Sequence, residues 1–139
     1  MDRETMRRLV GEARVGRVAT IDPDGRPNVV PFCFVLLGDT LYTSVDHKPK
    51  EGRRLRRVDN LLRDPRVTVI VDHYEEDWPR VWWVRMRGTG RVVEDASEVE
   101  RGNRLLAEKY AQYADDPPPG PILAIEVGEW RGWSYSPIQ

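Results

Sequence analysis

Short apolar runs separated by tight turns most constrain what this chain can fold into. In the first third of the sequence, such runs occupy residues 17–21, 27–37 and 41–45. Asp24-Gly25 and Gly38-Asp39 separate them, and Asp-Gly tolerates the positive φ values that tight hairpin turns require. The pattern predicts a three-stranded antiparallel meander, in which Pro31 must face a sheet edge or a bulge because it has no N–H to donate.

The rest of the chain adds strands and amphipathic helices without an α/β alternation. Further strands are predicted over residues 67–71, 81–93, 122–127 and 130–135. Helices are predicted where apolar residues recur at helical spacing, namely at Met6, Leu9, Val10 and Ala13, at Leu55, Val58, Leu61 and Leu62, and over Ser97–Tyr113. Ser97 and Glu100 form a capping box for the last helix. We therefore predict one mainly β domain over residues 1–139, a small antiparallel β-barrel with three peripheral helices.

Cysteine content and hydropathy exclude several classes of protein. Cys33 is the one cysteine, so neither an internal disulfide nor a thiolate metal cluster can form. No run approaches the roughly 20 apolar residues that cross a bilayer, and the N-terminal residues lack a signal-peptide pattern. We expect a cytoplasmic protein with no membrane partner.

Charge is unevenly distributed along the chain. The formal net charge is −1, yet residues 47–66 hold eight basic and three acidic side chains, so this segment carries +5 and the rest −6. The segment follows the strand residues Tyr42-Thr43-Ser44 and opens a predicted helix with Lys48, Lys50, Arg53 and Arg54. Hydroxyl groups, backbone N–H groups at a helix start and cationic side chains together suit a phosphate.

Two other interpretations of the basic segment stay open from charge spacing alone. Arginines at helical spacing often form only a solvated helix face. A nucleic-acid patch is a further option, but the overall charge is acidic and the five Trp residues lie away from the basic run. We therefore expect no nucleic-acid partner.

Catalytic side chains cannot be assigned from the sequence. His47 and His73 are the two histidines, and no metal-ligand spacing or glycine-rich nucleotide loop is present. Cys33 suits packing better than nucleophilic attack. Trp82 and Trp83 are strand neighbours and must point to opposite faces, so one of them faces the core and the other a subunit interface or a ligand. An enzyme of this kind would use a bound cofactor for its chemistry.

Three ordered motifs carry a family resemblance over residues 5 to 135. They are GRVATIDPDGRPNVVPFCFVLLGDTLYTSVDHKPK, NLLRDPRVTVIVDHYEEDW and GTGRVVED. In this order they resemble the FMN- or F420-binding split-barrel proteins related to pyridoxamine 5'-phosphate oxidase, and among these the actinobacterial branch of F420-dependent enzymes. The resemblance implies a split β-barrel of six to seven strands that works as a homodimer, with two cofactor sites at the subunit interface.

The resemblance also implies a set of cofactor-binding residues. Lys48 and Lys50 match positions that hold the cofactor phosphate, and Ser44, preceded by Thr43, matches a strand end beside it. Arg53, Arg54 and Asn60 continue this site. The backbone of Val29, Val30 and Pro31 matches the support of the cofactor ring, and Trp78 matches a site wall that reaches across the dimer. Residues 128–139 show no equivalent of the pyridoxal-phosphate-binding Arg/His set of the oxidases, although Arg131 lies near the C-terminal position of that set.

The expected function is F420-dependent hydride transfer to or from a small organic substrate, with no metal. The alternatives are an FMN-dependent oxidoreductase of the same fold and a non-catalytic F420- or flavin-binding protein. A haem-degrading role lacks support, because neither histidine has a recognisable ligand context.

Overall fold

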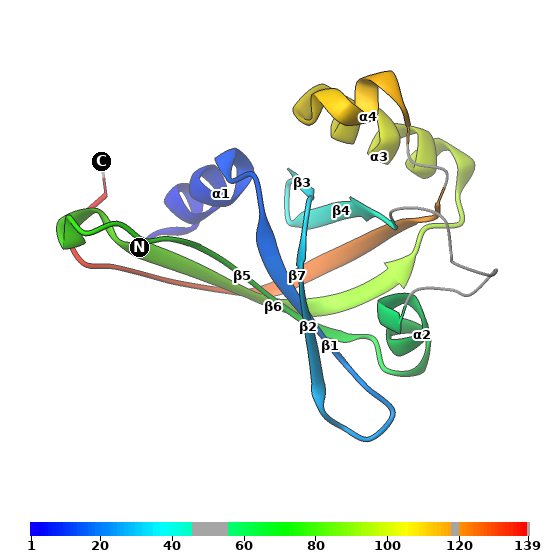
Figure 1. Ribbon diagram of the computed structural model, residues 1–139, viewed down its shortest axis with the longest axis horizontal. Coiled ribbons are helices and arrows are strands. Elements are labelled where there is room, and N and C mark those ends of the chain that lie inside the picture. Colours follow the sequence, from blue (N-terminus) through cyan, green and yellow to red (C-terminus); the bar gives the residue numbers. More distant parts are fainter. Residues whose placement is uncertain (46–55, 118–119, 139) are drawn as a thin grey trace.

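The computed structural model describes residues 1–45, 56–117 and 120–138, which centre on one curled antiparallel sheet (Figure 1). In this part of the chain, seven strands lie in the order β2-β1-β5-β6-β7-β4-β3. They are β1 (Gly16–Ile21), β2 (Pro27–Phe32), β3 (Val35–Leu37), β4 (Thr40–Ser44), β5 (Arg66–His73), β6 (Trp82–Val92) and β7 (Ile122–Ser134). β2 and β3 form the two edges, and the curl of the sheet gives half a barrel. The split-barrel prediction is confirmed.

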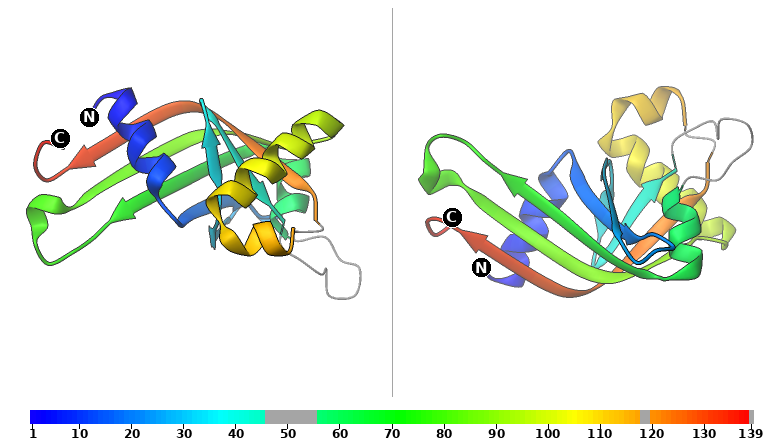
Figure 2. Two further views of the ribbon diagram at one scale, coloured as in Figure 1. Left: turned by 90° about the horizontal axis from the view of Figure 1, so that it is seen from above. Right: turned by 60° about the horizontal axis from the view of Figure 1, so that its bottom comes forward.

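Alternation along the strands sorts side chains between the concave and the outer face of the sheet. Val67, Val69 and Val71 of β5 are buried, whereas the residues between them are more accessible. On the neighbouring β6, Val84 and Met86 are buried beside them. Figure 2 shows α1 (Arg3–Glu12) crossing the concave face, where its apolar side packs into this core. On the opposite, outer face, α3 (Ala96–Lys109) packs against Tyr42 of β4 and Ile122 and Ala124 of β7 in a second, smaller core.

The helices begin and end close to the predicted positions. Besides α1, they are α2 (Arg56–Arg63), α3 (Ala96–Lys109) and the short α4 (Ala111–Asp115). In α2, Val58 and Leu61 are buried as predicted, but Leu62 is 57% exposed, so the apolar stripe is narrower than the sequence indicates. No helix in the described ranges is long and apolar enough to cross a membrane.

The predicted three-stranded meander is wrong in its pairing. Residues 27–37 form two strands, and β2 and β3 end up at opposite edges of the sheet. The two strands are separated at Phe34, whose backbone forms hydrogen bonds with side chains at the end of α3. The Phe34 N–H donates to the Tyr110 hydroxyl (3.1 Å), and the Phe34 carbonyl accepts from Lys109 Nζ (2.9 Å). Pro31 lies on the edge strand β2, as its missing N–H requires.

Two further element boundaries differ from the predictions. Residues 122–127 and 130–135 belong mostly to one strand, β7, which follows β6 along its whole length and passes a bulge between Arg87 and Gly88. The N-cap of α3 is Asp95, not Ser97. Its carboxylate accepts from the Glu98 N–H at 2.9 Å and from the Ser97 hydroxyl at 2.5 Å, so an acid two residues earlier takes over the cap. The predicted helix 97–113 also breaks at Tyr110.

Candidate functional site

The end of β4 carries the two strand hydroxyls expected beside a phosphate. Thr43 and Ser44 are each 3% exposed. The Thr43 hydroxyl donates to the Cys33 carbonyl at 2.7 Å. Ser44 Oγ is shielded from solvent and has no hydrogen-bond partner among the described residues. A buried hydroxyl without a partner is costly, and one that stands at the end of a strand can serve a ligand.

The cationic residues expected at this site follow Ser44 in the chain. Lys48, Lys50, Arg53 and Arg54 lie outside the described residues, in the connection from β4 to α2. Figure 1 shows the end of β4 and the helix α2 on the same side of the molecule, away from the two termini. In the sequence, this connection therefore joins the strand that ends at Ser44 to the first turn of α2.

Asn60 anchors α2 to β1 through a buried network. Asn60 is 1% exposed, and its Nδ2 donates to Thr20 Oγ1 (3.0 Å) and to Asp22 Oδ1 (2.9 Å). Its Oδ1 accepts from Arg63 Nη2 at 2.9 Å, and Arg63 also donates to the Ile21 carbonyl. Arg56, at the start of α2, pairs with Asp22 at 3.5 Å. Both amide hydrogens of Asn60 are thus engaged within the chain, and the network fixes α2, the helix in the second half of the basic segment.

The edge strand β2 offers an apolar support on the outer face. Val29 is 57% exposed and Pro31 is exposed with it, while Val30, between them, packs against the core. A shallow hollow of about 300 Å³ adjoins this surface, and Ala19, the cross-strand partner of Val29, is among its lining residues. Two of the three ring-support residues therefore present their side chains to the same surface.

Trp78 lies at the far end of the long strands. It begins a single 3-10 turn, Trp78–Arg80, between β5 and β6 and is 56% exposed. Its neighbours are Tyr74, whose hydroxyl lies 3.4 Å from Trp78 Nε1, and Tyr135, whose ring centroid is 6.5 Å away. Figure 1 places this turn beside the two chain termini and α2 on the opposite side. One chain therefore brings Ser44 and Asn60 to one end and Trp78 to the other.

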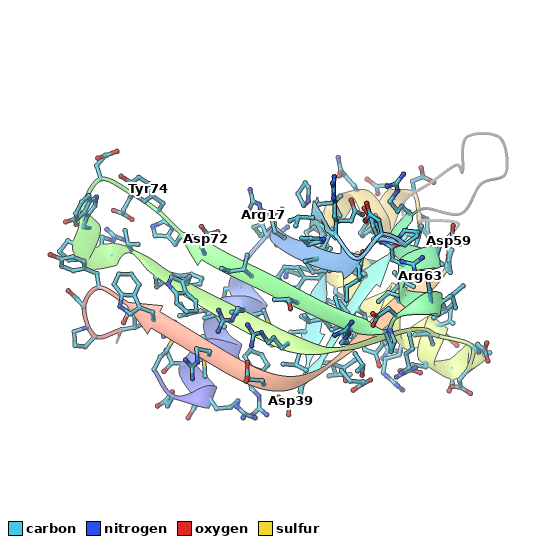
Figure 3. The ribbon with its side chains drawn as sticks, turned by 90° about the horizontal axis from the view of Figure 1, so that it is seen from below. Arg17, Asp39, Asp59, Arg63, Asp72 and Tyr74 are labelled. Carbon is cyan, nitrogen blue, oxygen red and sulfur yellow. The ribbon has the colours of Figure 1, made fainter. Side chains whose placement is uncertain are left out.

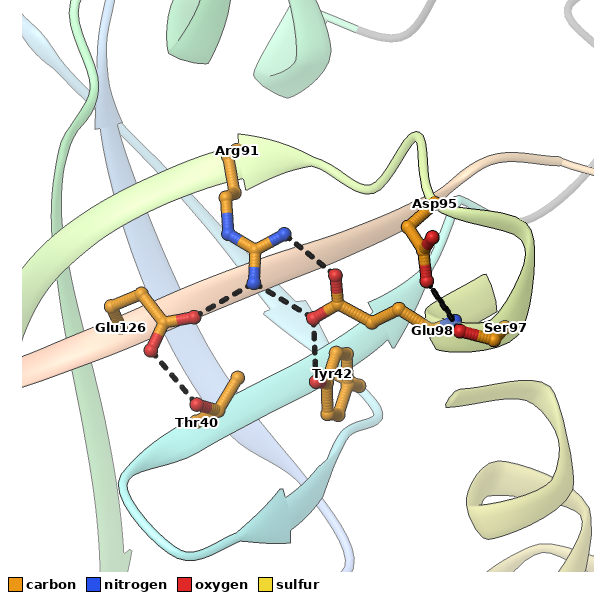
Figure 4. A network of polar contacts seen from close by, with 7 residues as sticks. All are labelled: Thr40, Tyr42, Arg91, Asp95, Ser97, Glu98 and Glu126. Carbon is orange, nitrogen blue, oxygen red and sulfur yellow. Dashed lines mark hydrogen bonds and ion pairs between the residues drawn. The ribbon is translucent and has the colours of Figure 1, made fainter. Parts of the chain in front are cut away.

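A second polar network joins α3 to the sheet and was not anticipated from the sequence (Figure 4). Glu98 accepts from Arg91 Nη1 and Nη2 at 2.9 and 2.7 Å and from the Tyr42 hydroxyl at 2.7 Å. Arg91 reaches Glu126 at 3.0 Å, and Glu126 accepts from the Thr40 hydroxyl. The hydrogen bonds from Arg91, and then from Tyr42, lower the pKa of Glu98 to about 2. Burial, followed by the Glu98 hydrogen bond, raises the pKa of Tyr42. The network holds α3 against β4.

Cys33 and Lys109 lie near the corner at Phe34. Cys33 is half-buried and free. The Lys109 ammonium lies 4.2 Å from the centroid of the Phe34 ring, and burial, with Arg14 second, lowers its pKa to about 8. Burial also raises the pKa of Tyr110, whose hydroxyl accepts from the Phe34 N–H and contacts the carbonyls of Arg14 and Phe34. These groups stabilise the corner. Lys109 and Phe34 are 75 residues apart in the sequence, so the sequence alone did not predict their contact.

Comparison with known proteins decides the family. A family profile described as Pyridoxamine 5'-phosphate oxidase matches residues 2–134. The chain belongs to the pyridoxamine 5'-phosphate oxidase family. No curated protein sequence gives a significant match to this family member.

Solved structures share the fold of this pyridoxamine 5'-phosphate oxidase family member. A conserved hypothetical protein of Mycobacterium tuberculosis superimposes with a TM-score of 0.81 at 20% identity, covering 96% of this chain and 85% of its own. A FAD-binding protein of Mesorhizobium loti gives 0.73 at 20% identity, with 95% and 94% covered. The FAD-binding protein of Mycobacterium smegmatis gives 0.72 at 17% identity, with 97% and 98% covered. At these identities the likeness establishes the fold, and the cofactor of this chain stays a prediction.

Proposed function

We propose that this chain is an oxidoreductase that binds a deazaflavin of the F420 type and works as a homodimer. Ser44 carries the proposal, because its buried hydroxyl has no partner among the described residues and it precedes a connection that contains two lysines and two arginines. A phosphate is the group that such a hydroxyl and such charges suit. Two neighbours with the same fold are named FAD-binding proteins, which supports a flavin-type cofactor. The positive charge beyond Lys48 and Lys50 suits an acidic tail and favours F420 over FMN.

The residues of this chain would hold the cofactor and position it. Ser44, Lys48, Lys50, Arg53 and Arg54 would bind its phosphate and neighbouring anionic groups. The outer surface at Val29 and Pro31 would support its ring, because both side chains are exposed on the same face.

The chemistry and the positioning then divide between cofactor and protein. When bound, a deazaflavin exchanges a hydride at its ring with a small organic substrate. Asn60 would act through α2, since its side chain is fully engaged with Thr20, Asp22 and Arg63. The acceleration would come mainly from holding the substrate against the ring and excluding water.

A second copy of the chain would complete the site. Ser44 pairs with Ile122 at the start of β7, whereas the turn that holds Trp78 precedes Trp82, which pairs with Ser134 at the end of β7, so within one chain Trp78 cannot wall the same site. It stands in an exposed aromatic group with Tyr74, Trp133 and Tyr135. Exposed aromatic groups of this kind are typical of subunit interfaces. A two-fold dimer would place the Trp78 of each copy in the site of the other.

Titration with F420 and with FMN tests the cofactor. Lys50→Ala should weaken F420 binding by about 1.5–3 kcal/mol, roughly tenfold to more than a hundredfold, because one charge-assisted contact is lost. Ser44→Ala should weaken it roughly tenfold for the same reason. Ser134→Ala, which changes a serine at the other end of the sheet, is the control and should leave the affinity unchanged.

The outcomes separate the alternatives. Unchanged affinity in both Lys50→Ala and Ser44→Ala would refute the site. Copurification of tightly bound FMN, seen in the visible absorbance, would show that the cofactor is FMN and not F420. Tight F420 binding without turnover of enones, quinones or nitro compounds would make the chain a binding protein.

Mixing two defective variants tests the shared site. Ser44→Ala and Trp78→Ala each damage one side of it. After co-refolding in equal amounts, half of the dimers are mixed and each mixed dimer has one intact site, so about a quarter of the wild-type binding capacity should return. No recovery, together with a dimeric mass in sedimentation, would show that Trp78 belongs elsewhere.

A further inference from the structure

A hollow of about 690 Å³ opens on the concave face of the sheet, between α1 and the far end of β5 and β6. Val71 of β5 is buried in the core, so His73, two residues further along, projects on the same concave side, and its cross-strand partner Trp82 projects with it. Figure 3 views the opposite, outer face and labels Asp72, which alternates with His73 in β5. Among the described residues, the lining of the hollow includes none from β2 or β4, so the hollow is separate from the proposed ring support and from Ser44.

The hollow has an apolar floor, and its size suits a small organic molecule. Leu9 of α1, Trp82 and Ile138 line it, and all three also pack in or against the hydrophobic core. Sites for small molecules commonly span about 300–1,000 Å³ and combine an apolar lining with a few polar groups. The polar lining residues here are Glu12, His73 and Arg80. The way in which these three are paired indicates the charge of a ligand.

On the side of the hollow formed by β5 and β6, the charges compensate each other. Glu75 Oε2 lies 2.5 Å from His73 Nε2 and 3.5 Å from Arg80 Nε. The Arg80 guanidinium therefore already has a carboxylate partner, and an anionic ligand would have to compete with Glu75 for it.

On the side formed by α1, the carboxylate of Glu12 is uncompensated. Glu12 is exposed and forms no ion pair with any residue in the described ranges. It is also the last residue of α1, and the last turn of this helix holds no basic side chain. The C-terminal end of a helix carries partial negative charge, so it favours a cation and disfavours a carboxylate. A cation bound beside Glu12 would therefore be attracted by the carboxylate and by the helix end together.

Trp82 adds a second group that attracts cations. Its indole ring lines the hollow and packs against the core, and the His73 ring lies nearly parallel to it, with 6.4 Å between the ring centroids and 23° between the planes. The face of an indole ring attracts ammonium groups. An unpaired carboxylate, a helix C-terminus and an indole ring above an apolar floor together suit an ammonium group on an apolar body.

We propose that this hollow binds an organic ammonium ion. Glu12 pairs with the charge of the ligand, Trp82 contacts its ammonium group and the neighbouring methylene groups, and Leu9 and Ile138 cover its apolar part. The site does not depend on the deazaflavin function, because it lies on the other face of the sheet from Val29 and uses none of the residues proposed to bind the cofactor.

Calorimetric titration of the full chain with 4-phenylbutylamine tests the site. The neutral 4-phenylbutan-1-ol and the anionic 4-phenylbutyrate have the same apolar body, so the three probes differ in charge, and the amine should bind most tightly. Glu12→Gln should weaken binding of the amine roughly tenfold, because one charge-assisted contact is lost, and should leave binding of the alcohol unchanged. The matched control is Glu4→Gln, which removes an exposed carboxylate from the first turn of the same helix, outside the hollow, and should bind the amine as the wild type does.

Thermal melts provide a second measurement and show whether the variants are folded. Without ligand, Glu12→Gln should raise Tm by about 1–4 °C, because it removes a carboxylate from the C-terminal end of α1. Glu4→Gln should lower Tm, because it removes a carboxylate from the N-terminal end, where a negative charge is favourable. The amine should raise the Tm of the wild type more than that of Glu12→Gln.

Four outcomes would overturn the proposal. They are the absence of amine binding in the wild type, equal or tighter binding of the alcohol or of 4-phenylbutyrate, unchanged binding of the amine in Glu12→Gln, and equal weakening in Glu4→Gln. Loss of self-association on addition of the amine, seen in sedimentation, would also overturn it, because a second copy of the chain would then occupy the hollow.

Discussion

Replacing Asn60 by Ala should destabilise the protein more than any other single amide removal in the described structure. The side chain makes three hydrogen bonds: two from Nδ2, to Thr20 and Asp22, and one at Oδ1, from Arg63. The bonds of Nδ2 link α2 to β1 and to the residue that follows it, and the bond from Arg63 lies within α2. The substitution removes them together and leaves a gap at a site that is 1% exposed.

The expected loss of unfolding free energy follows from the polar groups that lose Asn60 as their partner. Thr20 is 2% exposed, so its hydroxyl loses a donor that water cannot easily replace, which costs about 1–3 kcal/mol. Asp22 and Arg63 retain access to solvent or to other partners, and together with the small cavity they add about 1 kcal/mol. The expected loss is therefore about 2–4 kcal/mol, or a fall in Tm of roughly 6–12 °C for a chain of this size.

Urea unfolding followed by tryptophan fluorescence would measure this loss. Gln112→Ala, which removes an exposed amide from α4, is the control and should stay within about 0.5 kcal/mol of the wild type. A double-mutant cycle with Thr20→Val should give a coupling energy of about 1 kcal/mol. A loss below 1 kcal/mol in Asn60→Ala, combined with weaker cofactor binding, would refute the reasoning and make Asn60 a direct ligand.

Three further results are expected. Hydrogen bonds from Arg91 lower the pKa of Glu98 from 4.5 to about 2, so its stabilising effect is complete above pH 4.5 and is lost as the pH falls from 4.5 to about 2. Urea midpoints of the wild type and Glu98→Gln should therefore differ at pH 6 and converge near pH 2, and a constant difference would contradict this. Burial lowers the pKa of Lys109 from 10.5 to about 8, so the unfolded chain binds more protons than the folded chain between these pH values. The stability of the wild type relative to Lys109→Met should therefore rise from pH 8 to 10.5. Parallel plots of stability against pH for the two proteins would argue against a buried ammonium. Gly88→Ala should cost about 2 kcal/mol or more, because its Cβ would lie 1.9 Å from the Glu126 carbonyl oxygen. Gly128→Ala, with 3.9 Å to the nearest atom, should be tolerated in the same thermal melt.

The sequence predicted local features well because they depend on neighbours along the chain. Alternation in β5 and helical spacing in α1 and α2 mark which side chains face the core, and the resulting elements agree with the structure. The errors occurred where distant residues compete for local groups. Lys109 and Tyr110 bind the backbone of Phe34 and divide a predicted strand into β2 and β3. Asp95 captures the N–H of Glu98 and the hydroxyl of Ser97, which displaces the predicted cap.

The candidate site likewise depends on contacts between distant residues, which the sequence does not reveal. Its residue types and the family were accessible from the order of motifs, and the family profile confirms that membership. Thr43 and Asn60 are bonded to residues of other elements, whereas the Ser44 hydroxyl has no partner among the described residues, and neither fact was accessible from the sequence.

By itself, then, the run of apolar segments and tight turns determined an antiparallel, mainly β chain with peripheral helices, since burial periodicity and turn chemistry act over a few residues. Only the tertiary structure decided the strand order and which residues share a face. Cross-strand register depends on the packing of the whole sheet, and no spacing in the sequence reveals that Arg85 and Arg131 face each other.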